Sequence, residues 1–249
     1  MQNIIDLFCQ KKQVGNDRES MMTGLKGKTA IVTGGTGGLG RAIVERFVRE
    51  SMVVVVAARK PGSVPEGAEL ISADVTRESD VRDLFAKTAS KHGGVHILVN
   101  AAGGYLGGKK VSDVSLDEWQ QMMSLNLLSA FLCTREALRH MQGKPYGRII
   151  NISAMTALEP AAGKAPYAIS KAGVSLLTEI VAQEVKGTGI TINAIAPGII
   201  LTDANKSSMP KADSTKWVKP ADIADTICQL CSESNGVISG TTLRAFGGL

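Results

Sequence analysis

Residues 29–40 read TAIVTGGTGGLG, and this stretch decides the fold of the chain. It begins with TAIVT, whose β-branched and apolar composition is typical of a buried strand. Glycines follow, and the residues from Leu39 onward have the apolar spacing of a helix. A turn without side chains lets the backbone approach a pyrophosphate, whose charge is stabilised by the free N–H groups at the start of a helix. We therefore predict that a dinucleotide binds at Gly34, Gly38 and Gly40.

Strand-like and helix-like segments alternate along the rest of the chain. We expect strands over residues 29–33, 52–57, 69–73, 97–100, 148–152, 191–196 and 242–245. We expect helices over residues 39–51, 77–91, 116–141, 165–186 and 221–232, with a break in the third of them near Ser124. Such alternation builds a parallel sheet that is covered by helices on both faces. The predicted fold class is therefore α/β, with a single doubly wound parallel sheet of about seven strands.

The regular part of the chain forms one predicted domain. Residues 25–249 contain no repeat, no linker and no change of composition. Residues 1–24 differ from them, because the stretch 10–20 is polar and has no clear period. We expect a flexible N-terminal extension over residues 1–24 and a single folded domain over residues 25–249.

The composition narrows the class of protein. The chain has 249 residues, of which 44% are hydrophobic and 20% charged, as is ordinary for a globular domain with a large core. No apolar run reaches the ~18–20 residues of a membrane span, so we expect no membrane partner. The net charge of +5 is scattered, so we expect no nucleic-acid partner. Four cysteines without a secretory signal favour a cytoplasmic protein, and the three histidines lack metal-ligand spacing, so we expect no metal.

The end of the second predicted strand indicates which dinucleotide binds. An acidic residue at this position would hydrogen-bond the adenosine ribose of NAD. The strand ends instead with Ala57-Ala58-Arg59-Lys60, and a guanidinium is suited to bidentate contact with a phosphate. This pattern favours NADP (NADPH) over NAD, with Arg59 and Lys60 near the phosphate. The alternative is that Arg59 and Lys60 are an ordinary basic pair on the surface.

A second informative stretch is Tyr167-Ala168-Ile169-Ser170-Lys171. A tyrosine has a reference pKa near ~10, which is too high for ready proton exchange at neutral pH. Lys171 follows Tyr167 by one helical turn, and a cation there would lower the pKa of the phenol. We therefore predict that Tyr167 is a proton donor and Lys171 its electrostatic partner. The alternative is that both are surface residues of a helix.

These stretches belong to an ordered series, and residues 25–249 resemble a short-chain dehydrogenase/reductase of about this length. The series begins with the glycine turn and ends with the Tyr and Lys pattern. Between and beyond them, the segments that match the family are Asp74-Val75, Asn100-Ala101-Ala102-Gly103, Asn126, Asn193 and Pro197-Gly198-Ile199-Ile200-Leu201-Thr202. The resemblance implies a Rossmann-type sheet and nicotinamide-dependent redox chemistry.

The resemblance also implies a role for each residue. Tyr167 would protonate the substrate oxygen as hydride arrives from the nicotinamide, and Lys171 would also hold the nicotinamide ribose. Asn126 would hold a water molecule in the proton relay, so the catalytic residues are Tyr167, Lys171 and Asn126. The cofactor-binding residues would be Gly34, Thr36, Gly37, Gly38, Leu39, Gly40, Arg59, Lys60, Asp74, Val75, Asn100, Ala101, Ala102, Tyr167, Lys171, Pro197, Ile200 and Thr202.

One position departs from the family. The family usually carries a serine thirteen positions before the tyrosine, where it donates a hydrogen bond to the substrate carbonyl, and this chain has Ala154 there. Losing such a donor costs ~10²–10³-fold in rate where an oxyanion must be stabilised. Ser153 is adjacent, but consecutive residues of a strand point to opposite faces. A bulge or a twist at the strand end would let Ser153 replace the missing serine.

A second resemblance concerns the substrate. Residues 102–108 (AGGYLGG) and 208–217 (SMPKADSTKW) resemble stretches of quinonoid dihydropteridine reductases, which keep the Tyr and Lys and have alanine in the serine position. Those enzymes generally carry the acidic residue for NAD, whereas this chain has Arg59. Bacterial carbonyl reductases share similar segments, so both interpretations stay open.

The sequence thus predicts a reductase of small carbonyl or imine substrates that prefers NADPH. The alternatives are a dihydropteridine-type reductase, a 3-oxoacyl thioester reductase, or a dinucleotide-binding sensor or scaffold without turnover. The segment 202–219 is short where the family builds a substrate lid, which favours a small or flat substrate. Tyr105 is expected beside the pocket, and Trp217 belongs either to the lid or to the core. The resemblance also implies a homodimer or homotetramer that pairs through helices 116–141 and 165–186.

Overall fold

A computed structural model describes residues 23–59 and 62–248, and one parallel sheet organises this part of the chain. The sheet has seven strands in the order β3-β2-β1-β4-β5-β6-β7. Every neighbouring pair is parallel, which confirms the predicted doubly wound α/β sheet. The strands are β1 (Thr29–Thr33), β2 (Val53–Ala58), β3 (Ala68–Ser72), β4 (Ile97–Asn100), β5 (Gly147–Ile152), β6 (Ile190–Pro197) and β7 (Thr242–Ala245).

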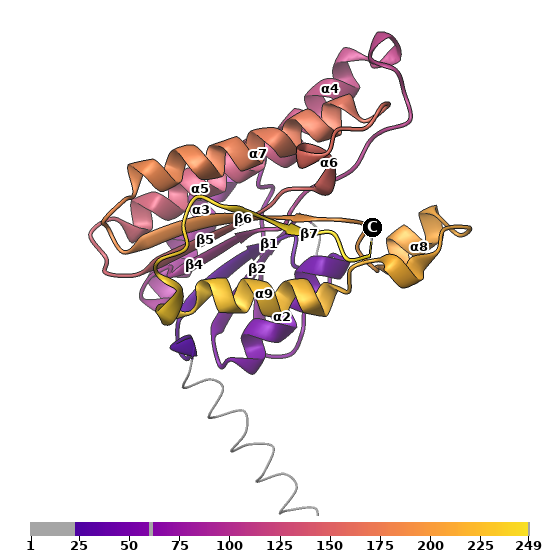
Figure 1. Ribbon diagram of the computed structural model, residues 1–249. Helices are drawn as coiled ribbons and strands as arrows, with labels where there is room; N and C mark the ends of the chain where they lie inside the picture. The colour runs from indigo at the N-terminus through magenta and orange to yellow at the C-terminus, as the bar shows by residue number, and fades with distance from the viewer. Residues whose placement is uncertain (1–22, 60–61, 249) are drawn as a thin grey trace, which may run out of the picture.

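Helices cover both faces of the sheet. The helices are α2 (Gly38–Arg49), α3 (Glu78–His92), α4 (Leu116–Met122), α5 (Ser129–Met141), α6 (Met155–Leu158), α7 (Ala165–Glu184), α8 (Asp203–Ser208) and α9 (Pro220–Cys231). Figure 1 shows α2 and α9 side by side on one face, with α3, α5 and α7 on the other. Short 3-10 turns at Val111–Asp113, Ser214–Lys216 and Glu233–Asn235 complete the chain.

Two apolar cores result from the alternation of side chains along the strands. Within β1, Ala30 and Val32 pack in the core under α2 and α9, while Ile31 between them packs in the core under the other three helices. β2 repeats the pattern, with Val54 on one side and Val55 on the other. A strand that is buried on both faces requires apolar side chains at most positions. This requirement explains the continuous apolar runs that made these strands predictable.

The topology creates a crevice at one edge of the sheet. The chain winds outward from β1 to β3 in one direction and from β4 to β7 in the other, so the order reverses between β1 and β4. Thr33 and Asn100, the last residues of these two strands, are register partners. In open α/β sheets, ligands bind outside the carboxyl ends of the strands at such a reversal. α6 and α8 lie at this same end of the sheet (Figure 1).

The main departure from the expected elements lies in the long helical region 116–141. The break expected near Ser124 is a π-helical turn, Met123–Leu128, between α4 and α5. The short helices α6 and α8 were not predicted. Thr23, expected in the N-terminal extension, is buried and donates a hydrogen bond to the Glu50 carboxylate at 2.7 Å. Gly24 is described as well, and residues 1–22 of that extension lie outside the described residues.

Candidate active site

The glycine turn joins β1 to α2 and leaves no room for a side chain at Gly34 or Gly40. Gly34 has a left-handed φ of +67°, and a Cβ there would lie 2.8 Å from the Cα of Ala102. A Cβ on Gly40 would collide with the carbonyl oxygen of Gly34. α2 begins after Gly37 without a side-chain cap, and its first turn contains no acidic residue. The backbone N–H groups at its start are therefore arranged to receive an anion.

Arg59 lies beside Asp74, in the loops that follow β2 and β3. Two hydrogen bonds from Thr76, from its hydroxyl at 2.7 Å and its N–H at 3.0 Å, hold the Asp74 carboxylate. The hydroxyl bond is the main cause of the lowered pKa of Asp74, and the positive charges of Arg59 and Arg77 contribute. The Arg59 side chain is exposed, and Ala58 ends β2 without a carboxylate. Lys60, predicted beside Arg59, lies outside the described residues.

The segment after β4 crosses directly over the glycine turn. The N–H of Ala102 donates a hydrogen bond to the hydroxyl of Thr33 at 3.1 Å. The side chain of Asn100, in contrast, faces into the protein, where its amide donates to Asn151 at 2.8 Å and Thr134 at 3.1 Å. Asn100 therefore joins β4 to β5 and α5 through its side chain. This network was not predicted, because the motif gives the position of Asn100 in the chain and not the direction of its amide.

Tyr167 and Lys171 lie on the first turns of α7. Lys171 is only 6% exposed, and its ammonium donates a hydrogen bond to the carbonyl of Ile152 at 2.8 Å. Burial lowers the pKa of Lys171 to about 8. Burial, with a smaller contribution from Tyr105, raises the pKa of Tyr167 to about 12. The predicted lowering of the Tyr167 pKa is therefore wrong for this structure, because desolvation of the phenol raises its pKa.

The buried Lys171 should make stability depend on pH. The unfolded chain holds its proton up to about pH 10.5 and the folded chain only up to about pH 8. Between these values the unfolded state binds more protons, so stability rises with pH. Without cofactor, the free energy of unfolding of the wild type should gain about 2 kcal/mol over Lys171→Met between about pH 7 and pH 10. Urea denaturation of both proteins measures this, and parallel pH profiles would contradict it.

Asn126 connects the loop after β4 to α7. It lies in the π-helical turn and is 1% exposed. Its side-chain amide pairs with both backbone groups of Gly104, accepting from the N–H at 2.9 Å and donating to the carbonyl at 3.1 Å. It also donates to the hydroxyl of Ser170 at 3.0 Å, which donates to the carbonyl of Tyr167 at 2.8 Å. π-Helical turns are frequent at functional sites, and this one aims Asn126 at the loop.

Ser153 does not replace the serine that is missing at position 154. Its hydroxyl donates to the carbonyl of Lys171 at 3.0 Å and lies 2.8 Å from the hydroxyl of Ser175. Both contacts belong to α7, and Ser153 is 1% exposed. Ala154 is the next residue and has an extended backbone. The alternation of a strand therefore holds here, and no bulge turns Ser153 toward the neighbourhood of Tyr167.

The segment after β6 folds back toward the glycine turn. A Cβ on Gly38 would lie 2.6 Å from Cγ2 of Thr202, so these two residues touch. The Thr202 hydroxyl caps α8 by accepting from the N–H of Asn205 at 3.2 Å. Ile200 forms a parallel bridge with Val218, which fastens the two ends of the segment to each other. Trp217 is 6% exposed and so belongs to the core rather than to an open lid.

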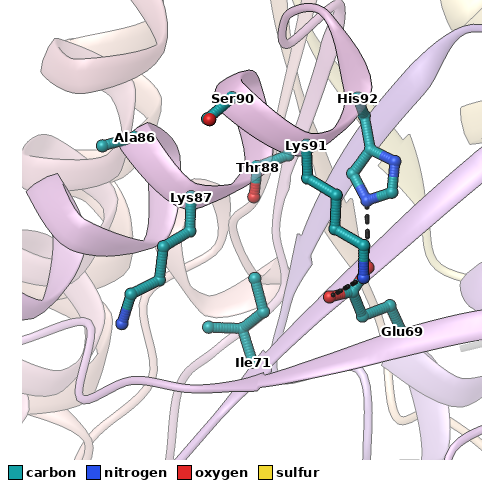
Figure 2. Close-up of a pocket in the computed structure, with 8 residues that line it drawn as sticks. All are labelled: Glu69, Ile71, Ala86, Lys87, Thr88, Ser90, Lys91 and His92. Carbon is teal, nitrogen blue, oxygen red and sulfur yellow. Dashed lines mark hydrogen bonds and ion pairs between the residues drawn. The ribbon is translucent and has the colours of Figure 1, made fainter.

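A separate hollow of about 530 Å³ lies at the other end of the sheet, between β3 and the end of α3 (Figure 2). Figure 2 shows Glu69 at its margin, with its carboxylate paired to Lys91 and His92, each at 2.9 Å. The residues that line it are Glu69, Ile71, Ala86, Lys87, Thr88, Ser90, Lys91 and His92. None of the residues predicted for the active site contributes to this hollow.

Two further properties concern the described residues only. Residues 23–59 and 62–248 contain no cluster of three or more His, Cys, Asp or Glu side chains that could hold a metal ion. In the same part of the chain, no helix combines the length and the apolar composition that crossing a membrane requires.

Comparison with known proteins identifies the family. A family model described as short chain dehydrogenase matches residues 28–213, well over half of the chain. The chain belongs to the short-chain dehydrogenase family. This is a family of oxidoreductases that act on CH–OH and C=O groups with NAD(P), and the match confirms the resemblance found in the sequence. The resemblance to dihydropteridine reductases stays a prediction.

Several relatives of this short-chain dehydrogenase are similar over almost their whole length. Glucose 1-dehydrogenase 2 of Bacillus subtilis is 32% identical, over 92% of this chain and 97% of its own. The 3-oxoacyl-acyl-carrier-protein reductase FabG of Haemophilus influenzae is 34% identical, over 90% and 99%. Among solved structures, the actinorhodin polyketide ketoreductase with NADPH superposes with a TM-score of 0.81 at 27% identity, covering 89% of this chain and 97% of the other.

Proposed function

We propose that this short-chain dehydrogenase is an NADPH-preferring reductase of a small carbonyl or imine substrate. The observation that carries the proposal is the convergence of Asn126 and Lys171 on one point of the loop after β4. A Cβ on Gly103 would lie 2.8 Å from Oδ1 of Asn126 and 3.2 Å from Nζ of Lys171. Tyr167 lies one helical turn before Lys171 on α7. A phenol at Tyr167 would add proton transfer to the binding of a nucleotide, and Asn126 would not be needed for that binding alone.

The residues around the glycine turn fit a dinucleotide. The turn excludes a side chain at Gly34 and Gly40, and the uncapped start of α2 offers backbone donors to a pyrophosphate. Asp74 and Val75 would border the adenine, and Ile200 and Thr202 the nicotinamide. When bound, NADPH would supply a hydride to the carbon of the C=O or C=N group.

Tyr167 would supply the proton that completes the reduction. Burial raises the pKa of Tyr167 to about 12, so the phenol carries its proton at neutral pH and would need a neighbouring positive charge to release it readily. It would give its proton to the oxygen or nitrogen of the substrate as the carbon accepts hydride. Lys171 would stabilise the phenolate that this step leaves, because a charge in a buried site is weakly screened. Asn126 would hold in place the loop at Gly104 and, through Ser170, the start of α7.

Arg59 tests the proposed preference for NADPH. An exposed guanidinium at the end of β2 would pair with the phosphate that distinguishes NADPH from NADH. Fluorescence titration should show NADPH binding at least about tenfold more tightly (~1.4 kcal/mol) than NADH. Arg59→Ala should abolish this difference, while Arg82→Ala, at an exposed position on α3, should preserve it. NADH binding equal to or tighter than that of NADPH would contradict the preference and favour the dihydropteridine-type alternative.

A 3-oxoacyl thioester is the second candidate substrate. It is suggested by two relatives, since the proteins from Haemophilus influenzae and Vibrio cholerae are both 3-oxoacyl-acyl-carrier-protein reductases. Other relatives at similar identity are named for a sugar and a steroid, including the 3beta-hydroxysteroid dehydrogenase 1 of Eggerthella lenta at 35%. The names of the relatives therefore do not select one substrate class.

We also infer that two copies of the chain pair through α5 and α7. Leu128, Phe131, Leu176 and Ile180 are exposed apolar residues on these helices and the π-helical turn before α5. A hollow of about 560 Å³ lies on this face, between Trp119 and Leu177. Contiguous apolar surface of this kind marks an interface, which supports the homodimer or homotetramer expected from the family resemblance.

A further inference from the structure

Tyr105 is an exposed aromatic residue placed directly against Tyr167. The centroids of the two rings are 5.0 Å apart, and the ring planes meet at 77°, an edge-to-face contact. Despite this contact, 61% of Tyr105 is exposed. The hydroxyl end of the ring lies against Gly107, where a Cβ would collide with it. The ring is thus held at two points and leaves much of its surface open beside Tyr167.

The loop that carries Tyr105 is fixed in position. Asn126 pairs with both backbone groups of Gly104, the residue directly before Tyr105. A Cβ on Gly104 would lie 2.7 Å from the side chain of Leu125, so the loop packs closely against the π-helical turn. At its other end, the N–H of Gly108 donates to the carbonyl of Gly163 at 2.7 Å. An exposed tyrosine on a loop anchored at both ends is preorganised for contact with a ligand.

We propose that Tyr105 forms one wall of the substrate site and selects planar, conjugated rings that carry the reducible C=O or C=N group. This inference rests on the proposed function, since it names the substrate class of the same site. A preorganised aromatic face contributes most to the binding of another flat π-system. A saturated ring or an acyclic chain is not flat, so it would gain less from the same face.

The absence of a serine at position 154 makes this wall more important. Ala154 offers no hydroxyl, and the hydroxyl of Ser153 is bound to α7. Fewer polar contacts are therefore available to orient the substrate in front of Tyr167. Contact with the face of Tyr105 would help to orient the substrate, as the hydrogen bond from the usual serine does in other members of the family. Conjugated carbonyls and imines also spread the charge that builds during reduction, so they depend less on a second donor at one oxygen.

The test compares a flat ligand with a saturated one of similar size on Tyr105 variants. Naphthoquinone and decalone are titrated by calorimetry into wild type, Tyr105→Leu and Tyr105→Phe in the presence of NADP⁺, so that binding is measured without reduction. Tyr105→Leu should weaken naphthoquinone binding about tenfold and decalone binding by no more than about twofold. Tyr105→Phe keeps the aromatic face and should bind naphthoquinone almost as wild type does.

The controls separate this inference from the proposed function. Val111→Ala, at an exposed position just beyond the loop, should leave the binding of both ligands unchanged, and circular dichroism checks that each variant is folded. Equal losses for naphthoquinone and decalone in Tyr105→Leu, or no loss for either, would overturn the role of Tyr105. Reduction of ketones by the wild type with NADPH is assayed separately. The turnover assay therefore tests the proposed function. The ratio of the naphthoquinone and decalone affinities tests the role of Tyr105.

Discussion

Replacing Tyr167 by phenylalanine should lower kcat for carbonyl reduction by about 10²–10⁴-fold and leave NADPH affinity close to that of the wild type. The substitution removes only the hydroxyl that would donate the proton. The ring that contacts Tyr105 is kept, so the geometry of the site should change little. Steady-state assays of NADPH oxidation measure kcat, and fluorescence titration measures the affinity for the cofactor.

The matched control for this variant is Tyr146→Phe. Tyr146 is also a partly buried tyrosine, and its hydroxyl donates to the carbonyl of Cys231, far from Tyr167. Tyr146→Phe should lose some stability and keep its kcat. Full activity of Tyr167→Phe would contradict the proposed proton donor. Equal losses of activity in the two variants would show that removing a buried hydroxyl, rather than a proton donor, lowers the rate.

Ala154→Ser should raise kcat/KM for a simple saturated ketone by about tenfold or more. The reason is that removing a side-chain donor near a developing oxyanion lowers the rate by ~10²–10³-fold in enzymes that have one. A serine introduced into a site that lacks one should restore only part of this rate factor. Conjugated carbonyls should gain less, because their charge is already spread. The same assay with Ala157→Ser, a matched change on α6, should show no gain. A loss of activity toward both substrate types in Ala154→Ser would contradict a missing donor at this position.

The central strands, such as β1 and β4, were predictable because they are buried on both faces. In β1 and β4 the bounds expected from the sequence agree with the structure at both ends, since apolar runs there are flanked by turn residues. The expected bounds of β7 agree as well, although this strand contains Arg244 and is only partly buried. The π-helical turn at Met123–Leu128 was recognisable only as a break. Asn126 in this turn pairs with Gly104, a residue of another segment of the chain. Contacts of this kind do not appear in the local pattern of residues.

In the candidate active site, too, some features could be predicted from the sequence and others depended on burial in the folded protein. The order of motifs placed Lys171 and Asn126 near one another, and the alternation of strand residues indicated that Ser153 would point away from position 154. The direction of the Tyr167 pKa was predicted wrongly, because spacing gives the distance to Lys171 and not the degree of burial. Burial affects both groups and raises the pKa of the phenol while lowering that of the ammonium.

The measurement that tests the central claim most directly is NADPH oxidation by the wild-type protein with a panel of quinones, ketones and a quinonoid dihydropterin. We expect turnover of at least one planar carbonyl or imine in the panel, with reduction at the C=O or C=N carbon. Tight binding of NADPH without turnover of any member would contradict a reductase. That result would favour instead a dinucleotide-binding sensor or scaffold built on the same sheet.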